Sequence, residues 1–267
     1  MFRSGKVRIF LALGIALFSL ISYYMKRQDN PVTGETQHVD MTVDQEIALG
    51  LQSAPEMIQQ YGGEYRNQQD QDRVERIGQK LVASSLPENQ PYKFDFHLLA
   101  DPQTINAFAL PGGQIFITYA LYSKLQSDDQ LAGVLGHEIG HVVERHSAQQ
   151  IAQQQLTQGL TGAAVIASYD PDNPTGSIGK AAMAALIANL VNMKYGRGDE
   201  LESDRNGVFY MAKTGYNPEG MIGVMEILAS SGGGRQPEFF STHPNPENRV
   251  THIREAIEEL NQKAVMP

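Results

Sequence analysis

The segment His137-Glu138-Ile139-Gly140-His141 contains the residue types of a catalytic metal site, at the spacing that such a site requires. Residues four apart on an α-helix differ by about 40° around the axis, so His137 and His141 would share a face and bind one metal ion. Glu138 would point in a neighbouring direction, toward a water molecule on that ion. The motif therefore predicts two metal ligands and a general base.

The flanking residues predict that this motif lies in a buried helix. Ser127 is a typical N-cap residue, acidic residues follow it, and Gln130 stands at the capping-box position. Apolar residues then recur at helical spacing: Leu131, Val134, Leu135, Ile139, Val142 and Val143. Two histidines and a glutamate that meet by chance on a core helix are the alternative, so the prediction of a metal site depends on further ligands.

A catalytic zinc site needs three protein ligands and a water molecule. The metzincins take their third ligand from the same stretch of chain, but they need a glycine and a histidine where this sequence has Glu144 and Ser147. That variant is excluded, and the third ligand is expected from a second helix.

The acidic segment 199–204 offers such a ligand. Glu200 and Asp204 are four residues apart and would share a helix face, so Glu200 could bind the metal. Asp204 would then accept a hydrogen bond from His137 or His141 and fix the tautomer of that ring. The alternative is an acidic helix start that complements the helix dipole and faces solvent.

The two motifs together resemble a known family, the zinc metallopeptidases typified by the HtpX heat-shock protease and the CAAX prenyl proteases. The resemblance is to the periplasmic BepA-like and LoiP-like members in particular, without the helical-repeat module that BepA carries. Three further segments match in order and spacing: Glu46 to Gly50, Asn106 to Gly113, and Thr242-His243-Pro244 with Arg249. The resemblance covers most of the chain beyond about residue 42. It implies an α+β, zincin-like metallopeptidase fold, mostly helical with a small β-sheet beside the HEIGH helix.

The resemblance also assigns roles to individual residues. It implies that Glu200 is the third ligand, with Glu202 as its substitute if the helix register differs. His243 would lie near the metal, where it occupies the open coordination position or donates to the substrate oxyanion; a turn histidine before proline is the alternative. Arg249 resembles a buried arginine that pairs with carboxylates of the site. The expected metal ligands are thus His137, His141 and Glu200, and the expected catalytic residues are Glu138, Asp204 and His243.

These residues predict hydrolysis of peptide bonds with one Zn²⁺ per chain. Zinc lowers the pKa of a bound water molecule from about 15.7 toward about 7. Glu138 would take the proton of that water as general base and then deliver it to the departing amide nitrogen. Two alternatives remain: a metal-binding chaperone or assembly factor with weak or latent proteolysis, and a processing peptidase with one dedicated substrate.

A substrate-binding strand is predicted at Gln114 to Tyr119, a β-branched and aromatic run after a Pro-Gly-Gly turn. If this strand is a sheet edge, it would bind an extended polypeptide through main-chain hydrogen bonds that do not depend on sequence, as suits unfolded or misassembled chains. An interior strand without substrate contact is the alternative.

Composition limits the other possibilities. The chain has 267 residues, a formal net charge of −9 and no cysteine. This charge offers no basic surface, so nucleic acid is not an expected partner. Without cysteine, disulfides and cysteine-based metal or nucleophile sites are excluded.

The N-terminus predicts export. Basic residues precede an apolar run at Ile9 to Met25, which is typical of an uncleaved membrane anchor or of a cleaved export signal. We therefore expect an export signal or anchor at 1–27, a polar tether at 28–41 and the catalytic domain at 42–267. The catalytic domain would lie in the cell envelope, on the periplasmic side of the inner membrane, and the resemblance implies a role in envelope protein quality control. A further apolar run, Ile178 to Met193, predicts a buried helix before the acidic segment.

Overall fold

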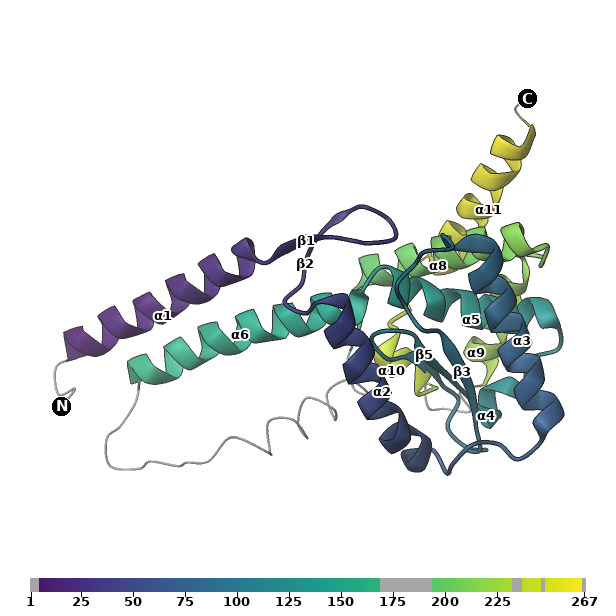
Figure 1. Cartoon of the computed structure of the whole chain (residues 1–267), viewed down its shortest axis with the longest axis horizontal. Coiled ribbons are helices and arrows are strands. Elements are labelled where there is room, and N and C mark those ends of the chain that lie inside the picture. Colours follow the sequence, from purple (N-terminus) through teal and green to yellow (C-terminus); the bar gives the residue numbers. More distant parts are fainter. Residues whose placement is uncertain (1–4, 169–193, 232–236, 246–247, 266–267) are drawn as a thin grey trace.

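The computed structural model describes residues 5–168, 194–231, 237–245 and 248–265 (Figure 1). The helices within these residues are α1 Gly5–Met25, α2 Val43–Gln60, α3 Gln68–Ser85, α4 Tyr119–Tyr122, α5 Asp128–Val143, α6 His146–Ser168, α8 Arg197–Thr214, α9 Gly220–Ser230, α10 Phe239–Thr242 and α11 Arg249–Val265. The strands are β1 Arg27–Asp29, β2 Thr36–His38, β3 Asp95–Leu99, β4 Ala107–Ala109 and β5 Gln114–Thr118. The predicted α+β fold, mostly helical with little sheet, is confirmed. The helix predicted at Ile178 to Met193 lies outside the described residues.

The larger sheet has three strands in the order β3-β5-β4, with β5 parallel to β3 and antiparallel to β4. The strand predicted from Gln114 onward is therefore present as β5, but it is the central strand. Every residue of β5 is buried, and a continuous apolar run is typical of a strand that is covered on both faces. The expectation that this strand forms a sheet edge for substrate is wrong, because β5 is an interior strand.

The two faces of the sheet pack against different helices, because successive side chains of a strand point to opposite sides. Ile115 and Ile117 of β5 belong to the main core, which also contains apolar residues of α3 and α5. Phe116, between them, belongs to a second cluster with Met57 of α2 and Phe108 of β4. Thus α2 covers one face, and α3 and α5 cover the other.

Helix starts and turns follow signals in the sequence. Thr42 caps α2 with a capping box, and Ser127 caps α5 by accepting a hydrogen bond from the backbone N–H of Gln130. Gly112, in the turn between β4 and β5, has a φ of +83°, and a Cβ atom there would lie 2.4 Å from the Cα atom of Ile47 in α2. Only glycine permits both this φ and this close approach, which brings α2 against the turn.

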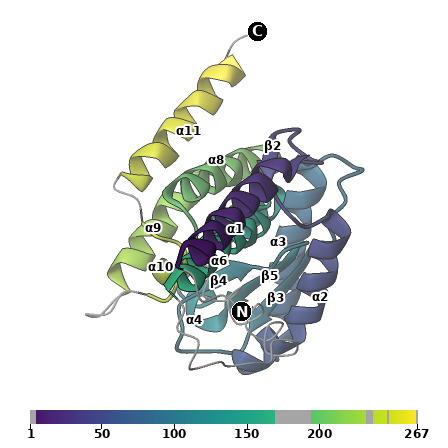
Figure 2. The ribbon, with the colours of Figure 1, turned by 90° about the vertical axis from the view of Figure 1, so that its left-hand side faces the viewer.

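The N-terminal helix α1 lies along α6, and both extend away from the sheet and the helices around it (Figures 1 and 2). Large apolar side chains of α1 are exposed along its length, among them Phe10, Leu13, Leu17, Phe18 and Met25. Within the part of the chain that the structure describes, no helix combines the length and the apolar character needed to cross a membrane.

The polar stretch expected as a tether, residues 28–41, is partly ordered against the catalytic domain. Strands β1 and β2 pair antiparallel. Nδ2 of Asn30 donates to the carbonyl oxygen of Val143 at 2.8 Å, and Nε2 of Gln37 donates to that of Glu144 at 2.9 Å. Carbonyl groups at a helix C-terminus have no partner within the helix, so this hairpin satisfies the end of α5. Polar composition suits a free tether and a helix cap equally, which is why it did not predict the contact.

Candidate metal centre

Two helices, α5 and α8, carry the predicted ligands and pack against each other at close range. A Cβ atom at Gly140 of α5 would lie 3.0 Å from the Cα atom of Ser203 of α8. About one turn earlier on α5, a Cβ atom at Gly136 would lie 3.2 Å from the Cα atom of Gly207. Small residues at these four positions permit the approach. Larger side chains there would push the ligand of α8 away from the histidines of α5.

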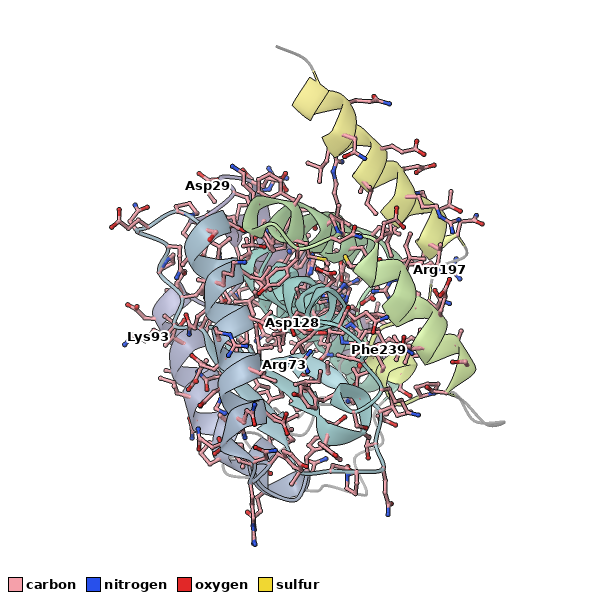
Figure 3. The ribbon with its side chains drawn as sticks, turned by 90° about the vertical axis from the view of Figure 1, so that its right-hand side faces the viewer. Asp29, Arg73, Lys93, Asp128, Arg197 and Phe239 are labelled. Carbon is pink, nitrogen blue, oxygen red and sulfur yellow. The ribbon has the colours of Figure 1, made fainter. Side chains whose placement is uncertain are left out.

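The start of α5 also contacts α3. Nη2 of Arg73 in α3 lies 2.7 Å from Oδ1 of Asp128, the first residue of α5 (Figure 3). An acidic residue in the first turn interacts favourably with the helix dipole. Because this ion pair is partly exposed, it contributes only about 0–1 kcal/mol, and the apolar packing of α5 does more to position the helix.

The side chains of His137, His141, Glu200 and His243 converge on one point. Nε2 of His137 lies 3.0 Å from Nε2 of His141 and 3.6 Å from Oε2 of Glu200. Nε2 of His141 lies 3.5 Å from Oε1 of Glu200. Nδ1 of His243 lies 3.3 Å from Nε2 of His137 and 3.1 Å from Oε1 of Glu200. One ligand atom from each of the four residues can therefore contact the same ion.

These separations fit a tetrahedral zinc ion. With zinc–nitrogen and zinc–oxygen bonds of about 2.0–2.1 Å, ligand atoms at tetrahedral corners lie roughly 3.3 Å apart. The separations of Nε2 of His137 from the two other ring nitrogens, 3.0 and 3.3 Å, lie close to this value. So do the separations of Oε1 of Glu200 from His243 and His141, 3.1 and 3.5 Å. Imidazoles combined with one carboxylate are also a donor set that zinc takes in proteins. The residues therefore fit the metal that the sequence predicts.

The protonation states of the ligands suit metal binding. Burial lowers the pKa of His141 well below its usual value, despite the adjacent carboxylate of Glu200, so the neutral imidazole can offer a lone pair. Burial alone would raise the pKa of Glu200, but the charge of His243 and the hydrogen bonds of the two histidines outweigh it. The pKa of Glu200 is therefore held well below its usual value, and the carboxylate is ionised.

Glu138 lies beside these ligands without a hydrogen bond. Its side chain is fully buried, and neither carboxylate oxygen accepts a hydrogen bond from any residue in the described ranges. Nε2 of His243 lies 3.6 Å from Oε1 of Glu138. Burial raises the pKa of Glu138, and the neighbouring His243 and His137 offset only part of that effect. A buried carboxylate in this state is suited to accept a proton from a reacting water molecule.

Asp204 orients His137, and Arg249 holds Asp204. Oδ1 of Asp204 lies 2.9 Å from Nδ1 of His137, an arrangement that places the ring proton on Nδ1 and leaves Nε2 for the metal. Nε and Nη2 of Arg249 donate to the two oxygens of Asp204 at 2.6 and 2.8 Å. Nη1 of Arg249 lies 2.9 Å from Oε2 of Glu200. Asp204 therefore orients His137 rather than His141, and the expected pairing of Arg249 with carboxylates of the site is confirmed.

Two aromatic residues that the sequence did not point to also surround the site. Tyr195, just before α8, stacks on the ring of His141 with the centroids 3.9 Å apart. Its backbone N–H donates to the carbonyl oxygen of Thr242, so it joins the segment before α8 to the segment that carries His243. Phe239 of α10, labelled in Figure 3, stacks on the ring of His243, with the centroids 4.4 Å apart. Isolated aromatic residues have no motif, so only the fold reveals their positions.

The register of α8 places Glu200, but not Glu202, among the candidate metal ligands. Glu202 lies outside the group of four ligands, and its Oε2 lies 3.0 Å from Nε2 of His146. The geometry therefore favours Glu200 over Glu202 as the third ligand. His146, which carries no motif of its own, is buried with its Nδ1 3.0 Å from Nδ1 of His141.

The site is enclosed. His137 is 3% exposed, and Glu138, Glu200 and His243 are each 0% exposed. In the conformation of the described residues, the ligands and Glu138 are closed off from solvent.

Most of this chain is similar in sequence to known proteins. The family model described as Peptidase family M48 matches residues 68–257. The beta-barrel assembly-enhancing protease of Yersinia pestis is 29% identical over 241 residues, which make up 86% of this chain and 47% of that protein. The metalloprotease YcaL of Escherichia coli is 29% identical over 191 residues, 68% of this chain and 70% of YcaL. The mitochondrial metalloendopeptidase OMA1 of Schizosaccharomyces pombe is 27% identical over 247 residues, 91% of this chain and 70% of OMA1. The chain thus spans less than half the length of the beta-barrel assembly-enhancing protease.

Proposed function

The chain belongs to peptidase family M48, and on this premise we propose that it is a zinc-dependent endopeptidase that acts in cell-envelope protein quality control. Family membership makes the chain a metallopeptidase. The observation that carries the zinc assignment is the convergence of His137, His141 and Glu200 on one point, with the unpartnered carboxylate of Glu138 beside it in the described part of the chain. Two imidazoles and one carboxylate are a ligand set of catalytic zinc sites.

In the proposed reaction, the metal and the residues around it have different roles. Bound zinc would supply Lewis-acid activation of water and of the scissile carbonyl group. Glu138 accepts the proton of the attacking water, because its buried carboxylate has a raised pKa. The carboxyl group then donates this proton to the departing amide nitrogen as the C–N bond breaks, releasing a carboxylic acid and an amine. Asp204 keeps the proton of His137 on Nδ1 throughout.

His243 would help to hold the metal together with His137, His141 and Glu200 in this conformation. Its Nδ1 lies 3.1 Å from Oε1 of Glu200 and 3.3 Å from Nε2 of His137, separations expected between ligands of one ion. Four protein side chains that hold the metal would leave less room for the water that the reaction needs. The burial of Glu138 also supports a latent resting state. Donation to the substrate oxyanion, the other role considered for His243, would require the ring to move from this position.

The proposed substrates are unfolded or misassembled polypeptides, and the proposed location is the cell envelope, on the periplasmic side of the inner membrane. The name of the Yersinia pestis relative, a beta-barrel assembly-enhancing protease, supports the proposal that this chain acts on envelope proteins. The exposed apolar side chains of α1 support attachment to the inner membrane through residues 9–25, because their transfer from water to lipid is favourable. Release from the membrane after signal cleavage is the alternative.

Replacing Glu138 with glutamine tests the proposed function. Cleavage of casein should fall by about 100-fold or more, because general acid–base catalysis contributes about 10²–10⁴-fold. The zinc content and the unfolding temperature should stay those of the wild type, because Glu138 is not a ligand. A metal-binding chaperone or assembly factor would keep its function in Glu138→Gln, and unchanged cleavage by this variant would refute the proposed role of Glu138.

Replacing His243 with alanine tests the latent state. Three protein ligands remain, so zinc should stay bound while casein cleavage increases. A decrease in cleavage would instead support His243 as an oxyanion donor. A processing peptidase with one dedicated substrate would leave casein intact with either residue at position 243.

A further inference from the structure

His146, which has no role in the proposed reaction, contacts the proposed metal ligand His141 directly. Arg145, at the junction of α5 and α6, has a φ of 57°, and this turn brings His146, the first residue of α6, back against α5. Nδ1 of His146 lies 3.0 Å from Nδ1 of His141, and each of these residues is 1% exposed. The other ring nitrogen of His146, Nε2, lies 3.0 Å from Oε2 of Glu202 in α8.

The positions of the protons along this contact follow from metal binding. Two ring nitrogens 3.0 Å apart need one donor and one acceptor. Nε2 of His141 faces the other ligands, 3.0 Å from Nε2 of His137, and needs its lone pair for the metal. A neutral His141 therefore carries its proton on Nδ1 and donates it to Nδ1 of His146. His146 then carries its own proton on Nε2 and donates it to Glu202. The hydroxyl group of Ser203 also lies 3.3 Å from Nδ1 of His146, on the accepting side of that ring.

The opposite direction is incompatible with metal binding. If Nδ1 of His146 were the donor, Nδ1 of His141 would accept, and the proton of a neutral His141 would lie on Nε2, where it would point at the metal. In a neutral His146, Nε2 would also lose its proton and would place a lone pair 3.0 Å from a carboxylate oxygen of Glu202. An ionised carboxylate only accepts hydrogen bonds, so Glu202 selects the direction that leaves Nε2 of His141 free.

We propose that His146 and Glu202 are positioning residues that hold His141 in its metal-binding tautomer, as Asp204 does for His137. This inference rests on the proposed role of His141 as a metal ligand. Hydrogen-bond partners behind a metal ligand fix the orientation of its ring, and their loss lowers metal affinity by about 10- to 100-fold. Both ligand histidines of α5 are then supported from α8, one by Asp204 and the other by Glu202 through His146.

Zinc affinity of the full-length protein tests the proposal. His146→Phe keeps an aromatic ring but removes the acceptor, and its zinc dissociation constant, measured by competition with a chelating indicator, should be about 10- to 100-fold above that of the wild type. His146→Asn, whose amide oxygen can accept near the position of Nδ1, should recover most of the affinity. Glu202→Ala should raise the dissociation constant by a smaller factor, because His146 can still accept.

His252→Phe is the matched control for His146→Phe. His252 lies on α11 and is 47% exposed in its side chain, with Nδ1 3.0 Å from Oε2 of Glu255, so its replacement should leave the zinc dissociation constant unchanged. The proposal is overturned if His146→Phe binds zinc as tightly as the wild type and the control. A wild-type protein that binds no zinc would instead overturn the proposed function.

A second measurement needs no variant and covers the case in which His146→Phe does not fold. In ¹⁵N spectra of the zinc-loaded wild-type protein, Nδ1 of His141 and Nε2 of His146 should each carry a proton that exchanges slowly with solvent. A bare Nδ1 on His141 would overturn the proposal even if zinc is bound.

Discussion

Replacing Arg249 with leucine should strongly destabilise the protein, although Arg249 is neither a metal ligand nor a proton donor in the reaction. Arg249 is 2% exposed and donates to both oxygens of Asp204, at 2.6 and 2.8 Å. Its Nη1 lies 2.9 Å from Oε2 of Glu200. Leucine would leave the carboxylate of Asp204 buried without its cation, and it would remove a positive charge beside Glu200.

The expected magnitude follows from the burial of the pair. Removing one partner of a buried ion pair costs about 3–5 kcal/mol, because the remaining charge is neither solvated nor paired. Glu200 keeps the contacts of three histidines, so most of the loss arises at Asp204. The free energy of unfolding should therefore fall by about 3–5 kcal/mol. For a domain of this size, about 2–4 °C corresponds to 1 kcal/mol, so the unfolding temperature should fall by roughly 6–20 °C.

Urea denaturation followed by circular dichroism measures this loss. The matched control is Arg205→Leu, because Arg205 pairs with Glu259 at 2.7 Å while its side chain is 64% exposed, and its loss should cost at most about 1 kcal/mol. Adding Asp204→Asn to Arg249→Leu should recover part of the stability, since the amide leaves no buried charge. A loss for Arg249→Leu no larger than that of the control would refute the reasoning.

Three further predictions concern the packing and the charges around the site. Gly207→Val places a Cβ atom 3.1 Å from a backbone nitrogen of α5, so it should lower the free energy of unfolding by about 1–3 kcal/mol and weaken zinc binding. The control Gly198→Ala, whose Cβ atom meets open space, should change neither. Equal zinc affinities of the two variants would contradict the proposed close packing. Asn30→Ala leaves a carbonyl group at the end of α5 without its donor and should lower the free energy of unfolding by about 1–3 kcal/mol, and an unchanged value would show that the hairpin does not hold α5. Burial opposes ionisation of Asp204, but Arg249 outweighs it and lowers the pKa below the usual 3.8. The ionised carboxylate of Asp204 therefore stabilises the folded state. This contribution is complete above pH 3.8 and is lost as the pH falls through the pKa of the folded state. Below pH 3.8, the free energy of unfolding of the wild type should therefore fall more steeply than that of Asp204→Asn.

The sequence predicted those parts of the site that depend on local helix geometry. The four-residue spacing of His137 and His141 determines that they share a face, and the same holds for Glu200 and Asp204. The sequence could not choose between the two histidines as the partner of Asp204, because that choice depends on how α5 and α8 pack. The glycines that permit this packing had no signal of their own before their neighbours in space were known.

The parts that the sequence missed depend on contacts between distant segments or on unusual backbone. His146 meets His141 because Arg145 adopts a φ of 57°, a conformation that no preference of arginine predicts. The position of β5 within the sheet depends on which strands pair with it, and its apolar run suits a central strand as well as an edge. The contact of Asn30 with α5 joins residues more than a hundred positions apart.

Metal analysis of the purified protein, combined with casein cleavage before and after chelation, tests the central claim most directly. We expect one zinc ion per chain, loss of cleavage on chelation, recovery on addition of zinc, and loss of cleavage with weakened zinc binding in Glu200→Ala. Full cleavage by the metal-free protein, or an unchanged zinc affinity in Glu200→Ala, would contradict the account.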